Sequence, residues 1–518
     1  MYNIGEVLRQ EIGVHVKILL VYPKSPTTFW SFKYALKFVS KKATLPPLGL
    51  LTVAAMLPAS WNLRLVDMNV ERLSENDLRW ADFVFVSAMS IQKESVHGVI
   101  SRCKTLGIKV IAGGPLFTSC PEEFDEVDHL VLNEAEITLP LFLEDLSKGN
   151  AGHIYTSPQW ADMGVTPLPR YDLVNMKKYA SMNVQYSRGC PFDCDFCNIT
   201  VLYGRIPRTK TTEQLLAEFD ALYALGWRYG VFIVDDNFIG NKGKLKREVL
   251  PAIIAWMEKR NHPFTLSTEV SINLADDDEL LKLMSMAQFD TVFVGIESPN
   301  DESLAECSKL QNRNRDMIAS VKKMQQHGLE VQAGFIVGFD KDPASIFERL
   351  IAFIQESGIV TAMVGLLNAP HGTKLYNRLK AEGRLVKSPT GDNTDFSINF
   401  IPKMNTEHLL TGYRKILDTI YSPKNFYART KQFLKDYRPV HVVKFRLRIS
   451  DFSTVIKSMV RLGVVGRERF QYWKLLLWSL LRRPRLLPLA ITFSIYGHHF
   501  RKVFNKHQKA LVTGPSHR

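Results

Sequence analysis

Two series of apolar, strand-like runs separated by helical stretches predict an α/β protein with two parallel sheets, followed by a mainly helical C-terminal region. The first series lies between residues 16 and 150, and the second between residues 182 and 368. Regular alternation of strands with helices is typical of parallel sheets, because each crossover needs enough chain to form a helix. The 518 residues, 46% of them hydrophobic, suffice for two or three domains.

The first series predicts a doubly wound, Rossmann-like sheet that occupies residues 10–150. Between its first two runs, residues 48–57 are apolar on nearly all sides, as expected for a helix packed on such a sheet. Pro46 and Pro47 mark the start of that helix. The five strand-like runs are residues 17–22, 62–67, 82–87, 108–113 and 129–132.

The second series predicts a partial (β/α)6 barrel that occupies residues 176–390. Six parallel strands with long intervening segments are typical of an incomplete barrel, in which chemistry gathers at the carboxyl ends of the strands. Residues 151–175 contain Pro158, Pro167 and Pro169 with little periodicity, and are predicted to form a linker between the two domains. The six strand-like runs are residues 182–187, 230–235, 264–269, 291–297, 330–338 and 361–368.

The basic character of the chain is confined to the C-terminal region, residues 391–518, which is predicted to be mainly helical. From residue 421 onward there are 21 Lys and Arg against 3 Asp and Glu, so the residues before 421 carry a net charge of −4 although the whole chain carries +14. Residues 471–493 are rich in Trp, Leu and Phe, but Arg482, Arg483, Arg485 and Pro488 interrupt them, which argues against a transmembrane helix. A solvated basic face and a peripheral contact with a membrane both fit this pattern.

Cysteine usage indicates a reducing compartment. Six cysteines in so long a chain, three of them in one loop, do not form a disulfide framework, and Cys103, Cys120 and Cys307 are predicted to be ordinary buried thiols. The first nine residues lack the basic-then-apolar pattern of a signal peptide. We therefore expect a cytoplasmic location, with peripheral contact to the inner face of the membrane as the alternative.

The remaining three cysteines, Cys190, Cys194 and Cys197, follow the first strand of the predicted barrel. Three thiolates in one loop can hold three irons of a four-iron cluster and leave the fourth iron open to a substrate or cofactor. A structural zinc site would need a fourth ligand, and no nearby Cys or His offers one. Polar side chains also end the later strands, namely Asp235, Asp236, Asn237, Ser267, Thr268, Glu269 and Glu297.

With these motifs in place, the chain resembles the cobalamin-dependent (class B) radical S-adenosylmethionine (SAM) methyltransferases, and within them the hopanoid C-2 methylase-like group. The resemblance implies an N-terminal cobalamin-binding domain, a radical SAM barrel and a family-specific C-terminal extension. It is carried, besides the cysteines, by residues 203–210, 234–242, 267–276, 294–299 and 333–340.

The resemblance implies a cluster and a SAM site at the carboxyl ends of the barrel strands. Cys190, Cys194 and Cys197 would ligate the 4Fe-4S cluster, which cleaves SAM by one-electron reduction. For each carboxylate the alternative is a structural ion pair or a cap of a strand end. The other implied SAM contacts are Phe196 near the adenine, Asp235 and Asp236 at the methionine end, Ser267 and Glu269 at the ribose or methionine moiety, and Gly295, Ile296 and Glu297 at the adenosine side.

The resemblance also implies a cobalamin site in the N-terminal domain. Cobalamin domains that ligate cobalt through histidine use Asp-x-His-x-x-Gly, whereas this chain has Asn69 at the histidine position and Arg72 at the glycine position. Histidine ligation from this motif is therefore excluded, and Glu134 and Glu136 stand in a run that lacks the glycine of the related Gly-Glu-x-Glu pattern. The implied contacts are Pro47, Leu48, Gly49, Asp67, Asn69, Gly113, Gly114, Pro115, Glu134 and Glu136.

The activity implied by the resemblance is transfer of a methyl group, through methylcobalamin, to an unactivated carbon of a hopanoid or other isoprenoid lipid. An external one-electron reductant such as ferredoxin or flavodoxin is the expected partner. The alternatives are oxidation, cyclisation or carbon–carbon coupling with the same cofactors on another lipid or natural product. An RNA-modifying or RNA-binding protein is a further alternative, but only the basic tail favours it, and nucleic acid is not an expected partner.

Overall fold

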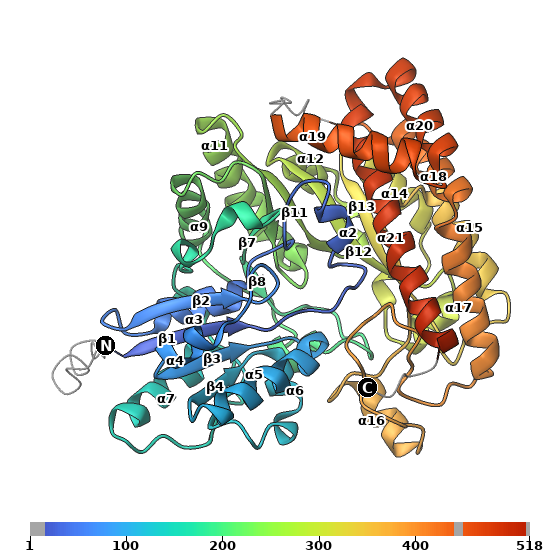
Figure 1. Cartoon of the computed structure of the whole chain (residues 1–518). Coiled ribbons are helices and arrows are strands. Elements are labelled where there is room, and N and C mark those ends of the chain that lie inside the picture. The colour runs from blue at the N-terminus through green and yellow to red at the C-terminus, as the bar shows by residue number, and fades with distance from the viewer. Residues whose placement is uncertain (1–15, 440–448, 514–518) are drawn as a thin grey trace.

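The computed structural model describes residues 16–439 and 449–513. Figure 1 shows two parallel sheets side by side, with the C-terminal helices gathered at the second sheet. The predicted α/β class with a mainly helical C-terminal region is confirmed. Residues 10–15 of the predicted first domain, and the N-terminal residues on which the signal-peptide prediction rests, lie outside the described residues.

The N-terminal sheet is entirely parallel, in the order β2-β1-β3-β4-β5-β6. The five predicted strands are present, and β6 is a sixth strand that lies inside the segment predicted as a linker. The strand order reverses beside β1, and ligands of doubly wound sheets bind at the carboxyl ends of the strands at such a point. The strands are β1 Lys17–Tyr22, β2 Asn62–Asp67, β3 Phe83–Ser87, β4 Lys109–Gly113, β5 His129–Val131 and β6 Ile154–Tyr155.

Alternation along β1 separates two hydrophobic cores. Leu19 and Val21 face one core, whereas Ile18 and Leu20 face the other, which includes Leu50 of α3. The sheet is thus covered on both faces, as a parallel sheet requires. Its helices are α3 Leu48–Met56, α4 Glu75–Trp80, α5 Lys93–Thr105, α6 Pro115–Ser119 and α7 Ala135–Ser147.

The second sheet is a six-stranded parallel sheet in the order β14-β13-β12-β11-β10-β7, which confirms the predicted partial barrel. Its strands are β7 Met182–Val184, β10 Gly230–Ile233, β11 Thr265–Val270, β12 Phe289–Glu297, β13 Glu330–Val337 and β14 Ala362–Leu366. A short antiparallel pair, β8 Ser187–Arg188 with β9 Arg208–Thr209, follows β7. The accompanying helices are α8 Ile199–Tyr203, α9 Thr212–Ala224, α10 Lys242–Lys244, α11 Leu250–Lys259, α12 Asp278–Met286, α13 Asp301–Glu306, α14 Met317–Gln326 and α15 Ile346–Ser357.

The C-terminal helices share the hydrophobic core of the second sheet. Phe426 and Phe500 are fully buried in that core, and Phe500 stacks on Phe29 with ring centroids 4.1 Å apart. Phe29 belongs to the long segment between β1 and α3 that also contains α2 Lys33–Leu36. No helix in the described ranges is long and apolar enough to span a membrane. The helices are α16 Lys374–Ala381, α17 Thr406–Ile420, α18 Pro423–Asp436, α19 Ile449–Ser458, α20 Arg469–Arg482 and α21 Leu487–Thr513.

Candidate active site

The cysteine loop connects β8 with α8 and is held by hydrogen bonds to other segments of the chain. It starts at Gly189, whose φ of +90° and close approach to the Ile206 carbonyl exclude a side chain, since a Cβ would lie 2.9 Å from that oxygen. The backbone N–H of Asp195 donates to the carbonyl of Cys307 at 3.0 Å, and the N–H of Leu375 donates to the carbonyl of Asp195 at 2.9 Å. The loop is therefore fixed by segments that follow β12 and β14.

The three sulfurs suit a cluster better than a single metal ion. The sulfurs of Cys190, Cys194 and Cys197 do not all lie within 4.8 Å of one another. Among the described residues, the ligand atoms of Cys120, Glu122 and His371 do. Zinc with Zn–S bonds of about 2.3 Å would draw its sulfurs closer together. Burial raises the pKa of all three thiols, that of Cys197 to about 12. In the absence of a bound metal these thiols are therefore protonated at neutral pH.

The other three cysteines differ from one another. Cys103 and Cys307 are buried, as predicted, but Cys120 is half-exposed at the end of α6. The prediction of an ordinary buried thiol is therefore wrong for Cys120, because the turn after the short α6 leaves its side chain near the surface.

Asp235 and Asp236 follow β10 and hold the chain that leads into the cysteine loop. Asp235 accepts hydrogen bonds from the backbone N–H of Tyr186 at 2.8 Å and from the hydroxyl of Ser187 at 2.6 Å, and Asp236 accepts one from the N–H of Gly189 at 2.9 Å. Burial raises the pKa of Asp235 to about 7 and that of Asp236 to about 6. These contacts give both residues a positioning role, while contact with SAM stays a prediction.

A buried lysine lies beside these carboxylates and was not predicted from sequence. Lys309 Nζ lies 2.9 Å from Glu297 Oε1 at the end of β12. Burial alone would lower the pKa of Lys309, but the charges of Glu297 and of the Cys194 sulfur raise it above its ordinary value. Lys309 is thus a permanent cation next to the cysteine loop. It belongs to no recognised motif, and only the folded chain brings it to the site.

Glu269 on β11 has a carboxylate without a hydrogen-bond donor among the described residues. Burial, followed by the charge of Asp236, raises the pKa of Glu269 to about 8. Ser267 and Glu269 are half-buried on the same side of β11, alternating with buried residues. An unpartnered carboxylate at a strand end is suited to receive the amino or hydroxyl groups of a ligand.

The remaining predicted SAM residues divide between two environments. Gly295 lies against the Lys309–Glu297 pair, because a Cβ there would approach Glu297 Oε1 to 2.4 Å. Ile296 points into the hydrophobic core and is fully buried, so its side chain does not face the Gly295 side of β12. Phe196 packs edge-on against Phe339 with ring centroids 6.3 Å apart.

Most of the predicted cobalamin-binding residues lie at the carboxyl ends of β2, β4 and β5. Asp67 accepts hydrogen bonds from the backbone and side chain of Asn69 and, at 3.0 Å, from the Tyr179 hydroxyl. Asn69 in turn accepts the N–H of Ser25 at 2.8 Å and donates to the carbonyl of Pro23. Asn69 therefore shapes the loop after β1 at the switch point of the sheet.

Two glycines form the tight turn after β4. A Cβ on Gly113 would lie 2.5 Å from the Val131 carbonyl, and one on Gly114, whose φ is +92°, would lie 2.6 Å from Ser87 Oγ. The glycines are thus required by the close packing of neighbouring strand ends, and Pro115 follows as the first residue of α6. Without side chains, the backbone of this turn packs closely against the ends of β3 and β5, at the carboxyl edge of the sheet where doubly wound folds bind ligands.

Pro47, Leu48 and Gly49 connect the two sheets. They start α3, and Leu48 packs against the core of the second sheet. The Asn183 side chain on β7 donates to the carbonyl of Pro46 at 3.1 Å. A Cβ on Gly49 would meet nothing within 4 Å, so this glycine leaves open space at the start of the helix.

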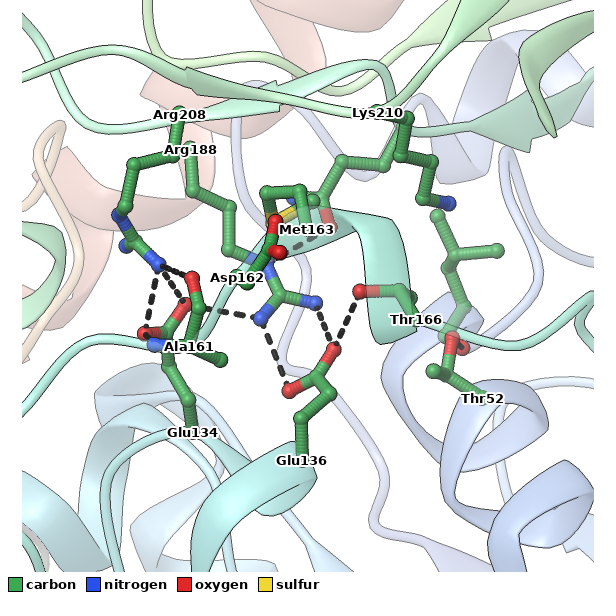
Figure 2. Close-up of polar contacts among 12 residues, drawn as sticks. Thr52, Glu134, Glu136, Ala161, Asp162, Met163, Thr166, Arg188, Arg208 and Lys210 are labelled. Atoms are coloured by element: carbon green, nitrogen blue, oxygen red, sulfur yellow. Dashed lines mark hydrogen bonds and ion pairs between the residues drawn. The ribbon is translucent and has the colours of Figure 1, made fainter. Parts of the chain in front are cut away.

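Glu134 and Glu136 form a buried ion-pair network with two arginines of the barrel (Figure 2). Arg188 donates to Glu134 at 2.8 Å and to Glu136 at 2.7 Å, and Arg208 donates to Glu134 at 2.9 Å. Both glutamate side chains are at most 3% exposed. The network fastens the start of α7 to β8 and β9. Arg188 and Arg208 were not predicted, since no local pattern links charges on such distant segments.

Comparisons with known proteins agree with this site. The B12 binding domain family matches residues 38–143, the radical SAM superfamily residues 184–354, and a domain of unknown function, DUF4070, residues 373–512. An uncharacterized methyltransferase of Synechocystis sp. is 41% identical over 490 residues, with 94% of this chain and 91% of that protein covered. The hopanoid C-2 methylase of Rhodopseudomonas palustris is 32% identical over 500 residues, with 93% and 92% covered.

This chain belongs to the cobalamin-dependent radical SAM methyltransferases. Among solved structures, the cobalamin-dependent SAM radical enzyme OxsB superposes with a TM-score of 0.61 at 14% identity, over 97% of this chain and 81% of OxsB, which supports the fold alone. The cofactors of the enzyme are a 4Fe-4S cluster, SAM and cobalamin. The donor set fits them: three separated thiols for the cluster, a free carboxylate for SAM and, for cobalamin, a glycine turn at the carboxyl edge of the N-terminal sheet.

Proposed function

We propose that this methyltransferase acts on an unactivated carbon of a hopanoid or of another polycyclic isoprenoid lipid. The observation that carries the proposal is the similarity to hopanoid C-2 methylase, which covers 93% of the chain. It therefore extends beyond the two cofactor-binding families into the C-terminal region. Because that region lies outside the two cofactor-binding matches, its similarity supports a shared class of substrate.

An apolar wall at the barrel supports a hydrocarbon substrate. Trp30, from the segment between β1 and α3, lies edge-on to Phe293 of β12 with ring centroids 5.4 Å apart. Its indole nitrogen lies 3.0 Å from the sulfur of Met363 on β14. On the intervening β13, Gly334 leaves room for the ring of Phe293, since a Cβ would lie 3.0 Å from it. Aromatic and methionine side chains are suited to the face of a fused-ring lipid.

The cofactors supply hydrogen abstraction and methyl donation when bound, and the residues of the chain position and shield them. Cys190, Cys194 and Cys197 would hold the cluster, while Lys309 provides a fixed positive charge beside it. Glu269 offers its carboxylate to the polar groups of SAM. Like other radical SAM enzymes, the protein needs an external one-electron reductant, for which ferredoxin or flavodoxin is the expected class.

The test is lipid analysis of a host with and without the gene, complemented by wild-type protein or by Cys194→Ala. We expect a lipid carrying one additional methyl group in the host with wild-type protein, and its absence in the deletion and in the Cys194→Ala strain. Unchanged lipids, together with loss of a methyl group from RNA or from a soluble metabolite, would overturn the lipid assignment. The proposal also includes peripheral contact of the C-terminal region with the membrane that contains such a lipid.

A further inference from the structure

Large apolar side chains are concentrated on one exposed part of the C-terminal region. Of the 25 large apolar side chains exposed in the described part of the chain, 11 lie within residues 452–481. This segment comprises α19, the π-helix η10 Met459–Val464 and α20, which we call the C-terminal hairpin. Figure 1 shows α19 and α20 at the edge of the molecule, away from the N-terminal sheet. The 11 side chains are Phe452, Ile456, Met459, Val460, Val464, Val465, Phe470, Trp473, Leu477, Leu480 and Leu481.

Helix α20 has apolar side chains on two opposite faces, and only one of these faces is buried against the rest of the described structure. The buried face consists of Tyr472, Leu475, Leu476 and Ser479. The exposed face consists of Phe470, Trp473, Leu477, Leu480 and Leu481, spaced as one stripe of an α-helix. Phe470 is 75% and Leu481 71% exposed. An ordinary surface helix places polar residues there, and none of the described residues covers this stripe, which is the pattern of an interaction surface.

The stripe continues across the turn of the hairpin. Val464 and Val465 at the turn are 63% and 75% exposed. The hydroxyls of Ser458 and Tyr472 lie 2.9 Å apart, and the indole N–H of Trp473 donates to the carbonyl of Gly463 at 2.9 Å. These bonds hold the two helices together, so their exposed apolar side chains belong to one compact unit.

Cations border this surface. Arg469 and Lys474 are exposed and, at about 100° per residue along α20, lie on either edge of its apolar stripe. Arg461 and Arg467 are exposed around the turn. The one acidic residue between residues 452 and 482 is Glu468, which is buried and pairs with Arg501 at 2.9 Å. The exposed face of the hairpin is therefore apolar and cationic.

We propose that the C-terminal hairpin docks this enzyme onto an anionic bilayer surface, with Val465 and Phe470 inserted among the lipids. An apolar stripe edged by Lys and Arg is the pattern of helices that lie in a membrane interface. A second copy of the chain is a poorer partner, because a symmetric contact would set these cations against one another. The inference deepens the membrane contact of the proposed function, but it rests on this surface and not on the identity of the methyl acceptor.

The test is flotation of the full-length holoenzyme with vesicles of phosphatidylcholine, with or without phosphatidylglycerol, at low and high salt. The wild type is expected to float with phosphatidylglycerol vesicles and less at high salt. Val465→Glu/Phe470→Glu is expected to remain at the bottom of the gradient, whereas Leu141→Glu, a change of an exposed leucine on α7, is expected to float like the wild type. Replacing Arg469 with Gln is expected to weaken vesicle affinity about fivefold.

Folding controls and oligomeric state complete the experiment. The double variant must retain the circular dichroism spectrum and the SAM cleavage rate of the wild type; if it does not, Leu477→Glu replaces it in the same test. A wild type that fails to float, or a folded variant that floats equally well, would overturn the proposal. So would a wild-type dimer that Phe470→Glu dissociates. Unchanged host lipids with normal flotation would refute the proposed substrate and leave the docking surface standing.

Discussion

Arg188→Met tests the ion-pair network that joins the cobalamin-binding domain to the barrel. Arg188 is 11% exposed and contributes every salt-bridge contact of Glu136, whose remaining side-chain partner is the hydroxyl of Thr166 at 2.9 Å. The variant leaves a carboxylate that is 3% exposed without a cation. Removing one partner of a buried pair costs about 3–5 kcal/mol. Arg170→Met, which breaks the exposed pair with Asp172, should cost less than about 1 kcal/mol.

The assay is urea unfolding of cofactor-free protein, followed by tryptophan fluorescence, for Arg188→Met, Arg170→Met and the double variant Arg188→Met/Glu136→Leu. The double variant removes both charges, so we expect it to be more stable than Arg188→Met alone. Native-state hydrogen exchange at residues 133–138 should report the same order. Equal midpoints for Arg188→Met and Arg170→Met, with no recovery in the double variant, would refute the assignment of a buried interdomain pair.

The pH dependence of the unfolding free energy provides a second test, because it should have opposite signs in the wild type and in Arg188→Met. Burial raises the pKa of Glu136, but the hydrogen bonds and charge of Arg188 more than offset it, so the pKa lies below its ordinary value. In the wild type the pair stabilises the fold above the ordinary glutamate pKa, and this stability is lost as pH falls through the lower folded pKa. In Arg188→Met the carboxylate is buried without a cation and its pKa rises. That variant should therefore lose stability as pH rises and recover part of it in acid.

Three further predictions concern the cysteine loop and its carboxylates. Cys194→Ala should abolish cluster absorbance and SAM cleavage, whereas Cys103→Ala, in the core of the first sheet, should retain both. Lys309→Met removes a cation beside the cluster and should lower its reduction potential, measured by redox titration with electron paramagnetic resonance; an unchanged potential would exclude that electrostatic role. Because burial raises the pKa of Glu269 to about 8, its contribution to the unfolding free energy of the cofactor-free protein should fall as pH rises from the ordinary glutamate pKa of 4.5 to about 8. Burial also raises the pKa of Glu330 to about 8, so Glu269→Gln should reduce this slope relative to the wild type without abolishing it, and an unchanged slope would refute the assignment.

The architecture was predictable from sequence because its signals are local. The longer strands of both sheets contain buried apolar residues, either in consecutive runs or, as in β11, in alternation with partly buried ones, and the crossovers between them are long enough for helices, so both strand sets follow from periodicity. The exception is β6, of which Tyr155 is buried and Ile154 is exposed. Two residues in a proline-rich segment carry no periodic signal, and pairing with β5 defines this strand.

The candidate site was predictable only where spacing within one loop encodes chemistry. The three cysteines are such a case, as are the paired aspartates after β10. Lys309 lies 12 residues after Glu297, on the segment that follows α13. Only the tertiary structure brings the two side chains together. Ile296 lies on the opposite face of β12 from Gly295, as the alternation of a strand predicts, and its contact with SAM stays a prediction.

The network at Glu134 and Glu136 also changes how the run that contains them is interpreted. Arg188 pairs with both carboxylates and Arg208 with that of Glu134, and contact of Glu134 and Glu136 with cobalamin stays a prediction. Arg188 stands two residues before Cys190, and the intervening Gly189 donates its N–H to Asp236. The start of α7, the cysteine loop and the end of β10 are thus joined by charge-assisted bonds. Because such bonds are directional and buried, they fix the orientation of the cobalamin-binding sheet relative to the cysteine loop. A methyl group can reach a carbon radical only if the two cofactors face one substrate, so the pairing of these glutamates with barrel arginines serves the reaction through geometry.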